Sequence, residues 1–204
     1  MLKTTPDAAG RYRVQFEDGT VMRLYRQTVE DFGLYTGLEL TDEEFSRLQT
    51  AAGEMSAKMR AVRIVSATNV SKKDLEQRLI QKGEDPGQAK AAVAWMEDLN
   101  LLDDRRTAEQ VVSSCISKGY GIQRAKQALY EKRIPKDLWE DALAEYPDQQ
   151  EKITAFLRSR LDADSDPKEI RNAIDGLIRR GHSYGNIRRA LDTLSFDTDE
   201  FPEE

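Results

Sequence analysis

Two adjacent aspartates are the residues whose types first suggest chemistry. A carboxylate pair such as Asp103 and Asp104 can serve in a metal site or in general acid–base catalysis. Neighbouring residues on a helix or turn point in different directions, so this pair is badly placed to hold one ion. Arg105 and Arg106 follow at once and oppose the negative charge. We therefore interpret the pair as a helix cap, favoured by the helix dipole.

The single cysteine and the single histidine restrict site chemistry further. Cys115 and His182 cannot supply a Cys/His zinc set, and one cysteine excludes an intramolecular disulfide. Cys115 lies on an apolar helix stripe and is predicted to be a core residue. His182 is predicted to stand at a break between repeats. The chain has no glycine-rich phosphate loop. We expect no catalytic residue, no metal and no cofactor, although an acid pair assembled by the fold stays open.

Basic residues recur at the breaks between predicted helices. Lys118 and Arg180 occupy equivalent breaks 62 residues apart (180 minus 118). A cationic edge complements an acidic protein surface or the phosphates of DNA. For any one of these residues the alternative is an ordinary solvated helix face. The predicted basic edge comprises Arg78, Lys82, Lys118, Arg124, Lys132, Arg133, Arg179, Arg180, Arg188 and Arg189.

Composition indicates a soluble, helix-rich protein. The 204 residues are 39% hydrophobic and 33% charged, and the net charge of −6 argues against a generic nucleic-acid coat. Residues 166–191 carry six basic and three acidic side chains, whereas residues 192–204 carry six acidic and none basic. The acidic end either screens the basic segment or acts only as a solubilising tail. No apolar run approaches the ~18 residues of a membrane helix, and no secretory pattern opens the chain, so cytoplasm is the expected compartment.

The first elements to be positioned are a hairpin and two helices. Residues 11–26 predict a β-hairpin, because apolar and polar residues alternate and Asp18-Gly19 favours a tight turn. Thr41 and Glu44 have the spacing of a capping box, which opens a helix. A separate helix is predicted at about residues 55–68 from its apolar stripe.

A helix-entry pattern then returns three times. Ser71, Gly121 and Ser183 each precede apolar residues four and eight positions later, at offsets of 50 and 62 residues (121 minus 71 and 183 minus 121). Such repeats predict stacked helical units and a binding surface rather than a pocket. Trp95 and Trp139, near the third helices, are predicted to pack. The predicted fold is mostly α, with tandem three-helix repeats in an elongated curved array and a small N-terminal β-hairpin. Its segments are a hairpin extension (1–40), a helical lead-in and first repeat (41–100), a second repeat (101–146), a truncated third repeat (147–194) and an acidic tail (195–204).

The chain resembles the bacterial RecX family from about residue 58 to residue 194. The matching residues are Ser71–Leu75 with Leu79 and Lys82-Gly83, the joint Leu99–Asp104 with Ala108, the break Ser117–Gly121 with Ile122, Arg124 and Leu129, and Arg180–Ser183 with Ile187. Two positions depart from the family pattern. His182 stands where the family usually has an aromatic residue, and Ala125 where a larger apolar residue is typical.

The resemblance implies a non-enzymatic modulator of the RecA recombinase. RecX-like proteins are curved arrays of three-helix modules that lie along the RecA–DNA filament and suppress its ATPase, co-protease and strand-exchange activities. We therefore predict a monomer that binds the RecA nucleoprotein filament, with weak contact to single- or double-stranded DNA and none to membranes. The alternatives are a helix-turn-helix-like transcriptional regulator and a helical scaffold for an unrelated partner.

Overall fold

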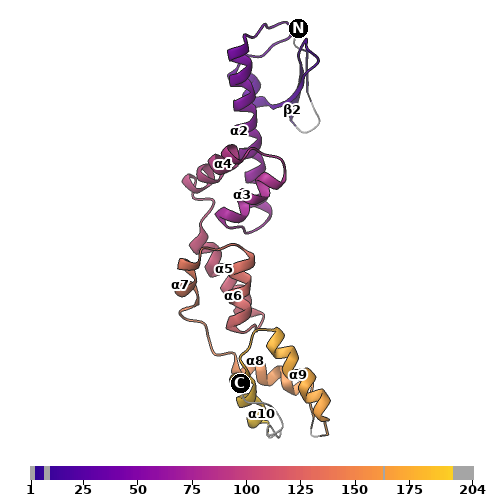
Figure 1. Cartoon of the computed structure of the whole chain (residues 1–204), viewed down its shortest axis with the longest axis vertical. Coiled ribbons are helices and arrows are strands. Elements are labelled where there is room, and N and C mark those ends of the chain that lie inside the picture. Colours follow the sequence, from indigo (N-terminus) through magenta and orange to yellow (C-terminus); the bar gives the residue numbers. More distant parts are fainter. Residues whose placement is uncertain (1–2, 7–9, 163, 195–204) are drawn as a thin grey trace. The chain divides into compact units, whose positions relative to one another are not determined.

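The computed structural model describes residues 3–6, 10–162 and 164–194. The chain divides into two compact units, the first ending at Leu102 and the second beginning at Asp103 (Figure 1). In the described part of the chain, helices predominate and the strands belong to the first unit. The predicted mostly helical fold with an N-terminal antiparallel hairpin is confirmed. The curvature of the array and the segment boundaries stay predictions, and the predicted acidic tail lies outside the described residues.

The first unit begins with a small antiparallel sheet. Its strands and first helix are β1 (Lys3–Pro6), β2 (Arg11–Gln15), β3 (Val21–Tyr25) and α1 (Arg26–Asp31). The predicted hairpin is β2–β3, in which Val14 pairs with Met22 and Gly19 supplies a positive φ of 86° in the turn. Strand β1, which pairs with β2, was not predicted. Val14 and Leu24 form a core with Leu34 and with Leu48 of the next helix.

One long helix links this sheet to the first three-helix group. Helix α2 runs from Asp42 to Ala67 without a break, so the prediction of two helices in this region was wrong. Its start is the predicted capping box, in which Thr41 and Glu44 exchange hydrogen bonds. Gly53 lies inside α2 because α4 approaches closely there: a methyl group would lie 2.3 Å from Nε2 of Gln88. The glycine therefore serves helix packing, and it does not end the helix.

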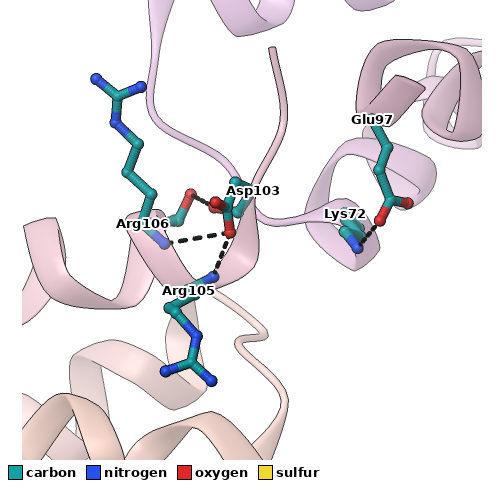
Figure 2. A network of polar contacts seen from close by, with 6 residues as sticks. Lys72, Glu97, Asp103, Arg105 and Arg106 are labelled. Atoms are coloured by element: carbon teal, nitrogen blue, oxygen red, sulfur yellow. Dashed lines mark hydrogen bonds and ion pairs between the residues drawn. The ribbon is translucent and has the colours of Figure 1, made fainter. Parts of the chain in front are cut away.

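Helix α2 packs with α3 (Lys72–Gln81) and α4 (Pro86–Asp98). Ser71 Oγ accepts a hydrogen bond from the Asp74 backbone N–H at the start of α3. Lys72 of α3 forms an ion pair with Glu97 of α4, which ties the second and third helices together (Figure 2). Their shared core is fully buried and includes Ala57, Ala61, Leu75, Leu79, Ala92 and Met96. Small residues on α2 allow the close helix approach.

The second unit contains the remaining helices. They are α5 (Asp104–Ser117), α6 (Ile122–Glu131), the short 3₁₀ turn η1 (Lys136–Leu138), α7 (Trp139–Leu143), α8 (Gln150–Arg158), α9 (Pro167–Arg179) and α10 (Tyr184–Thr193). Helices α3, α6 and α10 each have ten residues and begin at residues 72, 122 and 184. The predicted offsets of 50 and 62 residues are therefore confirmed at the level of helix starts.

Two separate cores organise the second unit. Helices α5, α6 and α7 surround Ala108, Val112, Leu129 and Ile134, and the Trp139 indole N–H donates to the Ile134 carbonyl. Helices α8, α9 and α10 surround a larger core. Its fully buried members include Ile153, Leu157, Leu177, Ile187 and Leu191. In this last group the helix that completes the bundle, α8, precedes the repeated pair α9–α10 in the chain, whereas α4 follows α3 in the first group.

Candidate partner-binding surface

The aspartate pair is a helix cap. Asp103 Oδ1 accepts hydrogen bonds from the backbone N–H groups of Arg105 (2.9 Å) and Arg106 (3.3 Å), as Figure 2 shows. Asp104 is the buried first residue of α5. Among the described residues, no group of three or more His, Cys, Asp or Glu side chains is arranged to hold a metal ion. The predicted capping role of the pair is therefore confirmed.

Four residues of the predicted basic edge are helix C-caps. Lys82 and Lys132 end α3 and α6, and Lys118 and Arg180 end α5 and α9. A cation at this position complements the negative end of the helix dipole. The recurrence predicted from spacing thus has a local structural cause. Because Lys82, Lys118 and Arg180 are also exposed, they stay available to an external partner.

Other members of the basic edge already have partners within the chain. Arg78 pairs with the buried Asp74 at 3.0 Å, Arg124 with Glu131 at 3.0 Å, and Arg189 with Asp148 at 3.6 Å. The hydrogen bond from Arg124 lowers the pKa of Glu131 and keeps that carboxylate charged. Lys132, Arg133 and Arg188 also interact within the chain. Exposed pairs of this kind contribute at most about 1 kcal/mol, so a partner can displace them.

Exposed apolar residues stand beside the basic C-caps, and the sequence pattern did not single them out. Ile80 on α3 and Tyr130 on α6 occupy equivalent positions 50 residues apart (130 minus 80). Their exposed fractions are 39% and 65%, which is high for such side chains. Each precedes the C-cap lysine of its helix by two residues. The first two repeats therefore present the same combination of an apolar and a cationic side chain.

A second group of cations gathers around one aromatic ring. Arg160 and Arg180 place their guanidinium carbons 5.2 Å and 4.4 Å from the ring centroid of Phe156. Lys152, one turn earlier on α8, donates from Nζ to the carbonyls of Ile116 and Ser117 at the end of α5. We name Lys152, Phe156, Arg160 and Arg180 the Phe156 cluster. Only Arg180 was predicted from the sequence, although the spacing 152, 156 and 160 was a readable signal.

The breaks before α6 and α10 meet through backbone atoms. The Gly121 N–H donates to the Arg180 carbonyl (2.9 Å), and the Gln123 N–H donates to the Gly181 carbonyl (3.3 Å). A methyl group at Gly121 would lie 2.0 Å from the Gly181 oxygen. Helix α6 has no side-chain cap, because the Gly181 carbonyl accepts from its first turn instead. These contacts join the α5–α6 break to the α9–α10 break.

His182 is buried at this junction. Its Nε2 lies 3.0 Å from the Gly119 carbonyl oxygen, where the neutral ring donates a hydrogen bond. Burial lowers the pKa of His182, and the charge of Arg180 lowers it further, whereas the bond to Gly119 acts in the opposite direction. Tyr146 donates to the Tyr120 carbonyl nearby at 2.7 Å, and burial raises the pKa of Tyr146 to about 12. His182 is thus a structural residue of the predicted repeat joint.

Acidification should destabilise this junction. The unfolded His182 titrates near its ordinary pKa, and the folded residue titrates lower, so the unfolded state binds more protons as the pH falls. We expect the urea midpoint to fall between about pH 7.5 and about pH 5.5. The His182→Gln variant, which cannot gain this charge, should show a smaller change over the same interval. Identical pH dependence in both proteins would show that other groups are responsible.

The comparisons with known proteins agree with this architecture. A family model described as RecX, second three-helix domain, matches residues 103–143. The regulatory protein RecX of Vibrio parahaemolyticus is 31% identical over 143 residues, which cover 69% of this chain and 92% of the relative. The chain belongs to the RecX family. A RecX protein of Clostridioides difficile is 25% identical over 92% of this chain and 91% of its own length.

Solved RecX structures share the fold. A crystal structure of regulatory protein RecX has a TM-score of 0.64 at 20% identity, with coverage of 94% of this chain and 97% of that one. RecX from Lactobacillus salivarius has a TM-score of 0.62 over 71% of this chain. The family consists of regulatory proteins and is not a known enzyme family, so the role of this chain is regulatory. Among the described residues, no helix is long and apolar enough to cross a membrane.

Proposed function

We propose that this chain binds the RecA–DNA filament and inhibits its ATPase, co-protease and strand-exchange activities. It thereby regulates recombination, DNA repair and the SOS response in the cytoplasm, as a monomer that needs no catalysis. Membership of the RecX family supports the regulatory part of this proposal. The identity of the partner and the direction of the effect come from the family resemblance of the sequence.

The repeated surface is the observation that carries the proposal. Ile80 beside Lys82 and Tyr130 beside Lys132 present similar chemistry at equivalent points of two repeats. A filament of identical subunits presents its own surface at regular intervals, so a repeated binding surface can contact successive subunits at once. Linked contacts raise the overall affinity above that of either contact alone. Exposed tyrosines next to cations are also typical of protein interfaces.

A steric mechanism follows from such binding. A protein that contacts two neighbouring subunits binds best to one relative arrangement of them. It therefore shifts the filament toward that arrangement and opposes the changes that accompany ATP turnover. The ten residues of the basic edge are proposed to supply electrostatic attraction to acidic surface on the filament.

The steady-state ATPase rate of RecA on single-stranded DNA tests the proposal. The rate should fall as the protein is added and reach a plateau at saturation, because occupied filaments turn over slowly. An unrelated DNA-dependent ATPase on the same DNA serves as the control and should be unaffected. An unchanged RecA rate at saturating protein would refute inhibition, and equal loss in the control enzyme would indicate that the DNA is merely covered.

A helix-turn-helix-like regulator is the second candidate function. Helix α6 exposes Gln123 and Lys126, and both residue types contact base edges in known complexes. This candidate requires tight, site-dependent binding to duplex DNA, with a cost of about 1–3 kcal/mol for each wrong base pair. Selection from a random duplex library distinguishes the two functions, since a filament regulator should enrich no sequence.

A further inference from the structure

The Phe156 cluster carries a local excess of positive charge. Lys152, Arg160 and Arg180 are exposed, and Phe156 is half-buried between α8 and α9. Within the described part of the chain, none of these three cations has a carboxylate within ion-pair distance. Asp175, the nearest acid before Arg180 along α9, forms no ion pair with them. The counter-charge for this cluster must therefore come from solvent or from a ligand.

The ring of Phe156 fixes the two guanidinium groups in position. Arg160 follows the end of α8 and Arg180 caps α9, yet both lie within 5.2 Å of the same ring centroid. Gly176 makes room for this ring, because a methyl group there would lie 3.2 Å from its Cζ atom. Cation–π contacts restrict arginine side chains that would otherwise move freely, so less entropy is lost when they bind an anion.

Spacing indicates the kind of anion. Lys152, Phe156 and Arg160 follow one another at intervals of four residues, which is about 6 Å of helix rise. This interval is close to the separation of successive phosphates on an extended nucleic-acid strand. Guanidinium groups also match phosphate oxygens through two parallel hydrogen bonds. Lysine contributes a point charge, held at the end of α5 by its bonds to Ile116 and Ser117.

We propose that the Phe156 cluster binds the phosphate backbone of a nucleic-acid strand, without reading its sequence. The proposal rests on the convergence of Arg160 and Arg180 on Phe156 in line with Lys152. It does not depend on RecA, so the ATPase test and the test below can fail separately. Binding through a few phosphates should be weak at physiological salt and strong only at low salt.

Fluorescence anisotropy with a labelled single-stranded oligonucleotide of mixed sequence tests the site. The double variant Arg160→Ala with Arg180→Ala should bind about tenfold more weakly at low salt. The slope of log affinity against log salt should also fall by about 1.4, since each lost phosphate contact on a single strand contributes about 0.7. Replacement of both arginines by lysine should restore most of the slope and part of the affinity.

The double variant Arg158→Ala with Arg171→Ala is the matched control. These exposed arginines belong to α8 and α9, lie outside the cluster, and change the net charge by the same amount. Loss of affinity equal to that of the cluster variant would overturn the proposal in favour of general electrostatic attraction. Displacement of the oligonucleotide by polyglutamate as effectively as by unlabelled DNA would also overturn it, because an acidic protein surface would then fit equally well. Absence of any binding at low salt would refute it directly.

Discussion

Replacement of Gly121 by alanine should lower the free energy of unfolding by about 2–4 kcal/mol, because a methyl group meets backbone that cannot move aside. The new Cβ would lie 2.0 Å from the Gly181 oxygen and 2.5 Å from the His182 nitrogen. Gly121 has an ordinary φ of −78°, so alanine suffers no intrinsic backbone strain there. The loss therefore measures the close contact between the two breaks. Urea unfolding followed by circular dichroism provides the measurement.

Gly185→Ala is the control for this substitution. Gly185 lies in the first turn of α10, and a methyl group there would have no neighbouring atom within 4 Å, so alanine meets open space. Its helix propensity should raise stability by up to about 1 kcal/mol. Equal urea midpoints for the wild type and the Gly121→Ala variant would show that the junction adjusts without cost. A loss in both variants would point to the unfolded state.

Removal of the repeated apolar contacts should abolish most of the effect on RecA. The double variant Ile80→Ala with Tyr130→Ala deletes the most exposed apolar side chains of α3 and α6. If both contact the filament, apparent affinity should fall by roughly 100-fold, because two linked contacts are lost together. The protein concentration that gives half-maximal inhibition of RecA ATPase is the quantity to measure. Helical circular dichroism should be unchanged, since both side chains lie on the surface.

Val21→Ala with Tyr35→Ala is the matched control. Val21 and Tyr35 are exposed by 42% and 61%, similar to the test pair, but they lie outside the repeated helices. The control should inhibit RecA as the wild type does. If it loses as much activity as the test variant, exposed apolar area in general is responsible. If the test variant still inhibits fully, filament contact lies elsewhere on the chain.

Local signals account for the parts of the fold that the sequence predicted well. The caps Ser71 and Ser183 and the apolar residues four and eight positions later act within single helices, so α3 and α10 begin where the pattern placed them. The hairpin follows from alternation and from the turn at Gly19. Asp103 caps α5 through hydrogen bonds to residues two and three positions away. None of these elements requires knowledge of distant contacts.

Contacts between distant residues explain what the sequence did not predict. Strand β1 has no apolar alternation and exists as a strand through its pairing with β2. Gly53 suggested a helix break, but its role depends on Gln88 in another helix. Arg160 and Arg180 are 20 residues apart (180 minus 160) and meet only because α8 and α9 fold onto one ring. The binding roles of the basic edge stay predictions for the same reason.

The uninterrupted course of α2 has a mechanical consequence. Its first half supplies Leu48 to the sheet core, and its second half supplies Ala57 and Ala61 to the first three-helix core. Both cores are therefore built on one rigid rod, and loosening of either one frays the helix that supports the other. A truncation that removes the sheet would leave the N-terminal half of α2 without its apolar partners. The sheet and the first repeat should accordingly open and close as one cooperative body.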